Sequence, residues 1–272
     1  KKFIKMKVLF LGDVIGNPGC LKIKDNLPDQ ILKKKIDFVI VNGENAAESG
    51  VGLTKEICDD LFECGVNVIT TGNHVWDQKE IMKHIDNENR LLRPHNLFEP
   101  SPGKGFEIYT TKNNLKIGVL NLMGNVFMKK CENVFLSAQN FLKKYNLKKD
   151  FDFLIVDFHG EITSEKNAMG HFFDGKATLV IGTHTHVPTN DARVLKNGTG
   201  YQTDAGMCGD YNSVIGMDKE NSLKRFIKED SIKLFPASGD VTLSGAIVDC
   251  NLETGLANNV ESFIFDGQLK NS

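Results

Sequence analysis

Residues 179–186 read Leu-Val-Ile-Gly-Thr-His-Thr-His, a short apolar run joined to a polar cluster that contains glycine and two histidines. Similar apolar runs that lead into polar clusters occur at residues 8–11, 38–41, 66–69 and 153–158. Continuous, β-branched runs of this length are typical of strands buried on both faces of a sheet. The repeated pattern therefore predicts a parallel or mixed sheet whose strands end in polar loops.

Helical patterns lie between these runs, at residues 54–64, 77–85 and 134–145, and Thr54 is a suitable N-cap for the first. The chain does not alternate strictly between strands and helices. Asn113-Asn114 suits the turn of a hairpin between 106–111 and 115–120, and Asn197-Gly198 a hairpin between 192–195 and 200–203. Further strands are expected at 245–251 and 260–265. Two sheets packed face to face with helices outside would accommodate all of these segments.

The bulk composition predicts one α/β domain over residues 1–272 and gives no sign of a charged partner. Length is sufficient for one sizeable core, and we find no repeat or linker. The 33 Lys and Arg residues nearly balance the 35 Asp and Glu residues, so no net field favours nucleic acid or an anionic membrane. We expect neither a stable nucleic-acid complex nor a membrane association.

The six cysteines and the start of the chain predict a cytoplasmic protein. No pair of cysteines has CxxC spacing, so reduced thiols are a better interpretation than a disulfide scaffold or a zinc ribbon. The basic residues 1–7 precede an apolar run, which superficially resembles a signal peptide. Asp13 interrupts that run too early, and we interpret it as a first strand.

Acids, amides and histidines fall just after the ends of the predicted strands. The carboxyl ends of strands are where α/β sheets bind ligands, so loops that are distant in sequence are expected to converge there. Carboxylates, amides and imidazoles together suit iron, manganese or zinc better than calcium. A carboxylate among them could bridge two ions. The residues in this pattern are Asp13, Glu44, Asn73, His74, His159, His184 and His186, with Asn45 beside Glu44.

Each of these residues also has a purely structural interpretation. Asp13 could sit in a turn or cap a helix, Glu44 could belong to a solvated turn, and Asn73 could be another cap. His159 could be a half-buried histidine of the core. The pair His184 and His186 is the hardest to explain without a metal, because two imidazoles one residue apart after a strand can reach adjacent ion positions. The remaining histidines, His84, His95 and His171, lie in less distinctive contexts.

The order Gly-Asp, Gly-Glu-Asn, Gly-Asn-His, His-Gly-Glu and Gly-Thr-His-Thr-His resembles the calcineurin-like metallophosphoesterase superfamily. Longer stretches, among them residues 12–16, 71–77 and 203–207, are similar to its YmdB-like bacterial branch. The resemblance implies a four-layer sandwich of two mixed β-sheets flanked by α-helices. It also implies a 2',3'-cyclic-nucleotide 2'-phosphodiesterase that works by metal-activated hydroxide attack on phosphorus.

Two positions depart from the wider superfamily. Many members carry Asp-x-His in the first motif, but here Asp13 is followed by Val14 and Ile15. The second motif usually presents a bridging Asp, whereas this chain has Glu44, with Asn45 as a replacement ligand. Both departures are typical of the YmdB-like branch.

The resemblance also implies roles for the site residues. Asp13, Asn45 and His186 would hold a first ion, and Asn73, His159 and His184 a second, with Glu44 as the bridge. The two divalent or trivalent ions would be iron, with manganese or zinc as alternatives. His74 would be the catalytic acid. Asp77 could orient His74, although capping of the helix that starts there is the favoured interpretation, and Glu161 could support a ligand histidine.

Other functions remain open at this stage. A phosphomonoesterase or nucleotidase could use the same site, and a non-catalytic regulatory protein could retain the fold. The expected partner is a nucleotide or another phosphodiester substrate, and a homo-oligomer is compatible with the sequence. The glycine-rich segment 203–216 could form an ordered loop near the metals or an exposed turn.

Overall fold

The computed structural model describes residues 6–228 and 232–269; the basic residues 1–5 at the start lie outside this description. One sheet has seven strands in the order β2-β11-β12-β1-β3-β4, with β13 also paired to β12. The pairs β1–β3 and β3–β4 are parallel, and β1–β12 is antiparallel, so the sheet is mixed. Its strands are β1 (Met6–Leu11), β2 (Asp13–Val14), β3 (Phe38–Asn42), β4 (Val68–Thr70), β11 (Met207–Asp210), β12 (Val241–Cys250) and β13 (Ala257–Phe265).

The second sheet has six strands in the order β5-β6-β7-β8-β10-β9. Its inner strands are parallel, whereas β5 and β9 each join it as the edge strand of an antiparallel hairpin, as predicted from the asparagine-containing turns. The strands are β5 (Phe106–Thr110), β6 (Lys116–Met123), β7 (Phe153–His159), β8 (Leu179–Thr183), β9 (Arg193–Val194) and β10 (Gly200–Gln202).

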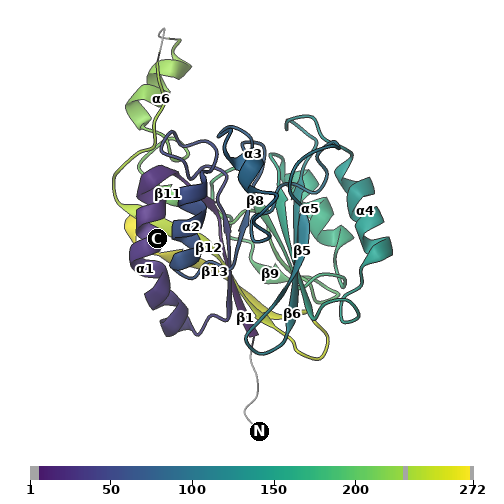
Figure 1. The fold of residues 1–272 in the computed structure, drawn as a ribbon. Coiled ribbons are helices and arrows are strands. Elements are labelled where there is room, and N and C mark those ends of the chain that lie inside the picture. The colour runs from purple at the N-terminus through teal and green to yellow at the C-terminus, as the bar shows by residue number, and fades with distance from the viewer. Residues whose placement is uncertain (1–5, 229–231, 270–272) are drawn as a thin grey trace.

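Helices cover the outer face of each sheet (Figure 1). The first sheet is covered by α1 (Gly16–Lys34) and α2 (Lys55–Glu63), and the second by α4 (Val134–Lys144) and α5 (Thr163–Phe172). The remaining helices are the short α3 (Ile81–His84), the 3₁₀ turn η1 (Gly267–Leu269) and α6 (Lys219–Phe226), which projects away from the sandwich.

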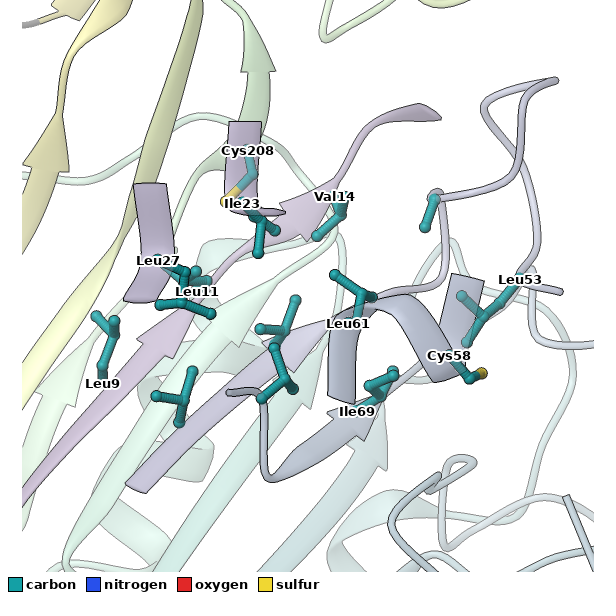
Figure 2. Packing of buried hydrophobic residues seen from close by; sticks show 14 of the residues in the cluster. Leu9, Leu11, Val14, Ile23, Leu27, Leu53, Cys58, Leu61, Ile69 and Cys208 are labelled. Carbon is teal, nitrogen blue, oxygen red and sulfur yellow. The ribbon is translucent and has the colours of Figure 1, made fainter. Parts of the chain in front are cut away.

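Three apolar clusters confirm the four-layer α/β arrangement. Leu9 and Leu11 of the first sheet belong to one cluster with Ile23 and Leu27 of α1 and Leu61 of α2 (Figure 2). A second cluster joins inward-facing residues of both sheets, and a third packs the second sheet against α4 and α5. Because successive side chains of a strand face opposite ways, β1 can serve the first cluster with Leu9 and the second with Phe10.

Two helices differ from the sequence expectation. No helix was predicted over residues 16–34, where Pro28 disfavours one; α1 forms nevertheless and buries a stripe that includes Gly19, Ile23 and Leu27. Gly19 is required there, since a Cβ would lie 2.4 Å from the carbonyl oxygen of Cys208. The helix predicted at 77–85 is much shorter, beginning only at Ile81.

Other local predictions are confirmed. The Thr54 hydroxyl accepts a hydrogen bond from the N–H of Ile57 as the N-cap of α2. All six cysteines are free. Among the described residues, no helix combines the length and the apolar character needed to cross a membrane.

Candidate metal centre

The first sheet supplies oxygen ligands to one edge of the sandwich. Asp13 opens β2, Glu44 and Asn45 follow β3, and Asn73 follows β4. Asp13 and Glu44 are fully buried and Asn45 is 4% exposed, so their oxygens are withdrawn from bulk water. The predicted convergence of these strand ends is therefore observed.

The second sheet supplies imidazoles to the same edge. His159 is the last residue of β7, and His184 and His186 follow β8. The Nε2 atom of His159 lies 2.8 Å from Glu44 Oε1, 3.1 Å from Asn73 Oδ1 and 3.1 Å from His184 Nδ1. Four side chains from both sheets thus meet around one point.

A second group lies beside the first. His186 Nε2 is 3.6 Å from Asp13 Oδ1, and the other carboxylate oxygen of Asp13 accepts a hydrogen bond from the N–H of His184 at 3.0 Å. Asn45 donates its amide to the carbonyl of Gly50 at 2.9 Å, which orients its Oδ1 as an acceptor. All seven ligand residues predicted from the sequence therefore lie at this edge.

The site is chemically incomplete as protein alone. Asp13 Oδ1 and Asn45 Oδ1 are buried acceptors without a hydrogen-bond donor, and Glu44 Oε1 faces only the Nε2 atom of His159. Leaving such atoms unpaired is costly, and buried charges are normally paired or bound to metals. One ligand atom each from Glu44, His159 and His184 lies within 4.8 Å of the others, which is compatible with a shared cation. The donors fit a metal centre.

Gly72 shows how tightly this centre is built. A Cβ at this position would lie 2.2 Å from His159 Nε2 and 2.4 Å from Glu44 Oε2. Any side chain at residue 72 would therefore occupy the space in which the ligand atoms meet. The glycine of the Gly-Asn-His motif is required by this close approach.

Electrostatic coupling joins the acids to the imidazoles. Burial acts to raise the pKa of Glu44, but the charge and hydrogen bond of His159 outweigh it and lower that pKa. Burial acts in the opposite sense on His159, and Glu44 with Asp13 raises its pKa to about 9. Burial and the charge of His159 lower the pKa of His184 to about 3. The imidazole of His159 therefore carries positive charge between the carboxylates of Glu44 and Asp13. A bound metal ion can supply that positive charge instead.

The loop that carries His184 and His186 adopts an unusual backbone. Their φ angles are 95° and 64°, in the left-handed region that residues other than glycine rarely enter. Long-range contacts hold it: Asp13 binds the N–H of His184, and the carbonyl of Ile215 accepts from His186 Nδ1 at 2.7 Å. The segment 203–216, which includes β11, is thus ordered and lies beside the site.

Sequence reasoning missed a buried ion pair behind this loop. Lys166 of α5 and Asp204 are 2% and 0% exposed, and Lys166 Nζ lies 2.5 Å from Asp204 Oδ2. The same carboxylate accepts a hydrogen bond from the Thr185 hydroxyl at 2.6 Å, so the pair fixes the residue between the two histidines. A lysine within a helix gives no signal of burial in the sequence. Asp204 was the one member of the pair with a sequence signal, because it lies in the stretch 203–207 that is similar to the YmdB-like branch.

A second missed group orients His159. Its Nδ1 lies 2.9 Å from the Thr183 hydroxyl, which in turn donates to Asp157 Oδ1 at 2.7 Å. Thr183 therefore accepts from Nδ1–H and leaves Nε2 free to bind a metal. Burial raises the pKa of Asp157 to about 6, although three donors stabilise its ionised form. An acid in the middle of the apolar run 153–158 was the available sequence signal.

His74 lies at the rim of the centre. Its backbone N–H donates to Glu44 Oε2 at 3.0 Å, and its Nδ1 is 2.7 Å from Asp77 Oδ2. The interpretation of Asp77 as a helix cap is wrong: Glu80 occupies the N-cap of α3, and Asp77 holds the imidazole instead. Glu161 lies 3.0 Å from His184 Nε2, the nitrogen that points away from the cluster, and so takes the supporting place suggested for it.

The remaining histidines lie outside the cluster. His84 belongs to α3 and His171 to α5, and His95 contacts the ring of Phe141. None of the three joins the ligand group found among residues 6–228 and 232–269. The assignment of these histidines to structural roles agrees with their positions.

Comparison with known proteins gives matches along the length of the chain. The model of the YmdB-like protein family matches residues 9–263. The 2',3'-cyclic-nucleotide 2'-phosphodiesterase of Bacillus subtilis (strain 168) is 42% identical over 261 residues, covering 96% of this chain and 97% of that protein.

Two solved structures have the same fold with 36% identity and a TM-score of 0.88. One, a hypothetical protein from Thermus thermophilus, covers 97% of this chain and 100% of its own. The other, described as a novel phosphatase from Mycoplasma pneumoniae, covers 97% of this chain and 94% of its own. The range matched by the family model, residues 9–263, spans the positions of the candidate centre.

Proposed function

This chain belongs to the YmdB-like protein family, and we propose that it hydrolyses 2',3'-cyclic nucleotides at the 2'-ester bond with two bound metal ions. As a member of that family it is a metal-dependent phosphoesterase. The observation that carries the proposal is the convergence of unpaired buried oxygens and imidazole nitrogens on one edge of the sandwich.

We assign the ligands by their positions in the two groups. Asp13, Asn45 and His186 would hold one ion, and Asn73, His159 and His184 the other, with Glu44 between them. The close contacts of Glu44 Oε1 with His159 and of Asp13 with His186 support this division. When bound, such ions supply Lewis-acid activation of water and neutralise charge on the phosphate. Mixed oxygen and imidazole donors suit iron, manganese or zinc, and among these the family resemblance favours iron.

His74 is the residue that we assign to proton transfer. The Asp77 carboxylate accepts from Nδ1–H, which directs the second ring nitrogen away from Asp77. As an imidazolium, His74 would donate its Nε2 proton to the 2'-oxygen when the bond between that oxygen and phosphorus breaks. The product would be a nucleoside 3'-phosphate. The side chain of His74 is 29% exposed, so it can reach a substrate from the rim.

A substrate panel tests the proposal. Protein purified without chelators is assayed with 2',3'-cyclic AMP, 3',5'-cyclic AMP, bis-p-nitrophenyl phosphate and p-nitrophenyl phosphate, and its metal content is measured in parallel. We expect 2',3'-cyclic AMP to have the highest kcat/KM and to give 3'-AMP. Preference for p-nitrophenyl phosphate would favour a phosphomonoesterase, and bound metal without any turnover would favour a regulatory protein.

A further inference from the structure

The loop formed by residues 124–133, between β6 and α4, presents an aromatic ring to solvent. Phe127 is 85% exposed, the highest value among the large hydrophobic side chains that the structure describes. Its φ of 60° lies in the left-handed region, which is rare for a bulky residue. A ring exposed on a strained backbone favours a functional role over a packing role.

The base of this loop is fixed, so the conformation of Phe127 is imposed. The carboxylate of Glu165, 8% exposed, accepts hydrogen bonds from the N–H of Asn125 at 2.9 Å and of Val126 at 3.4 Å. The side chain of Asn125 accepts from the N–H of Val134 and donates to the carbonyl of Glu132. A strained residue held in this way is preorganised for a contact that the protein alone does not make.

The same loop reaches the metal centre. Lys129, two residues beyond Phe127, donates to the carbonyl oxygen of Asn73 at 2.5 Å and lies 3.4 Å from Asp77 Oδ1. Asn73 is a proposed ligand and Asp77 holds His74, so the side chain of Lys129 brings this loop to the edge of the metal centre, where the phosphate of a substrate would bind. The only tryptophan, Trp76, packs against the core instead.

We propose that Phe127 is a specificity-determining residue whose ring stacks on the nucleobase of the substrate. In a 2',3'-cyclic nucleotide the base lies one ribose away from the phosphate, which suits a platform at the edge of the centre. Every base has a π-face, so the contact accepts purines and pyrimidines and favours the larger purine. The inference rests on the proposed function and extends it to the nucleoside part of the substrate.

The experiment compares a substrate with a base to one without. Kinetics are measured with 2',3'-cyclic AMP and with methyl riboside 2,3-cyclic phosphate, using Phe127→Leu, Phe127→Asn and Phe127→Trp. For Leu and Asn we expect KM for 2',3'-cyclic AMP to rise about tenfold with kcat retained, because one stacking contact is lost. Trp should keep KM low. The base-free substrate should respond to none of the three changes.

Matched variants separate stacking from loop collapse. Asn tolerates the left-handed backbone, so Phe127→Asn should preserve the loop and the melting temperature. Phe226→Leu makes the same change as Phe127→Leu in α6, at a ring that is 76% exposed, and should leave both substrates unaffected. Equal losses on both substrates, or no loss with 2',3'-cyclic AMP, would overturn the proposal.

A binding measurement keeps the outcome independent of turnover. Calorimetry is done with 3'-AMP and with ribose 3-phosphate. Phe127→Leu should weaken the binding of 3'-AMP and leave the binding of ribose 3-phosphate unchanged. Suppose that the unmodified protein hydrolyses neither cyclic phosphate but Phe127→Leu weakens the binding of 3'-AMP. The proposed activity then fails while the nucleoside subsite stands. If 3'-AMP binding is unchanged, the subsite fails even where cyclic AMP is hydrolysed.

Discussion

The two sheets contribute different chemistry to the same edge of the molecule. The first sheet provides the oxygen half of the centre, Asp13, Glu44, Asn45 and Asn73, whereas the second provides the imidazole half, His159, His184 and His186. Neither half brings together both kinds of donor, so the centre depends on how the two sheets pack. The apolar cluster between the sheets is therefore also a support for the site.

The halves also differ in how they are held. In the part of the chain that is described, none of the four oxygen residues has a positive φ, whereas His184 and His186 both do. The imidazole half accordingly depends on distant partners, including Asp204, Ile215 and Thr183. Substitutions in the oxygen half should thus remove metal ligands and lower activity directly. Substitutions of the residues behind the imidazole half should act by displacing the histidines or by lowering the stability of the fold.

The largest effect is expected from the oxygen half. Glu44→Gln removes the charge that we place between the two ions, and kcat should fall on the order of 10³-fold with loss of metal, since metal ions contribute several kcal/mol. Steady-state kinetics with metal analysis measures both. Glu161→Gln is the matched change in a residue that only supports His184, and it should lower kcat about tenfold. Similar values for the two variants would contradict our placement of Glu44.

Next comes the stability of the imidazole half. Lys166→Met leaves the Asp204 carboxylate buried without its cation, and the free energy of unfolding should fall by about 3–5 kcal/mol. Burial already raises the pKa of Asp204, with Lys166 offsetting only part of that effect. Urea denaturation measures the loss, and Lys166→Met/Asp204→Asn should recover most of it.

A surface pair provides the control for this variant. Lys33 Nζ and Asp29 Oδ2 lie 3.5 Å apart on exposed side chains. Lys33→Met should lower the free energy of unfolding by less than about 1 kcal/mol. If Lys166→Met is no less stable than Lys33→Met, the buried pair does not support the loop of His184 and His186.

His74 follows β4 of the first sheet but is not one of the proposed ligands, so it tests whether the two halves have been assigned correctly. His74→Asn should retain metal and lower kcat about 10²-fold or more, because the proton donor is lost while the ligands remain. Metal content and activity are measured on the same preparation. Loss of metal would make His74 a ligand and would enlarge the imidazole set.

The smallest effect is expected from the hydroxyl behind His159. Thr183→Val removes the acceptor of His159 Nδ1–H without a large change of shape, and Mn²⁺ affinity should weaken about 10–100-fold. Calorimetry on chelator-treated protein measures this. Thr71→Val is the control, since the Thr71 hydroxyl binds only the carbonyl of Leu92. An equal effect of both changes would indicate general destabilisation.

Much of the fold could be predicted because its strands are short, apolar and β-branched. The runs at 8–11, 38–41, 66–69, 153–158 and 179–181 fall in β1, β3, β4, β7 and β8, with only small shifts of their ends. Helix α1 could not be predicted, since local propensity penalises Pro28 and it is tertiary packing against β11, β12 and α2 that compensates. Asp77 was misinterpreted because a cap and an ion pair look alike in sequence; the distance to His74 decides between them.

By itself, the sequence determined which side chains could bind metal and where they fall, because donor type and strand-end position are local properties. All of these residues do lie at one edge. Only the tertiary structure decided which donors meet, that the loop of His184 and His186 turns left-handed, and that Lys166 is buried beside Asp204. Those outcomes depend on two sheets and an outer helix packing together, and contacts between residues so far apart in the chain leave no periodic signal in it.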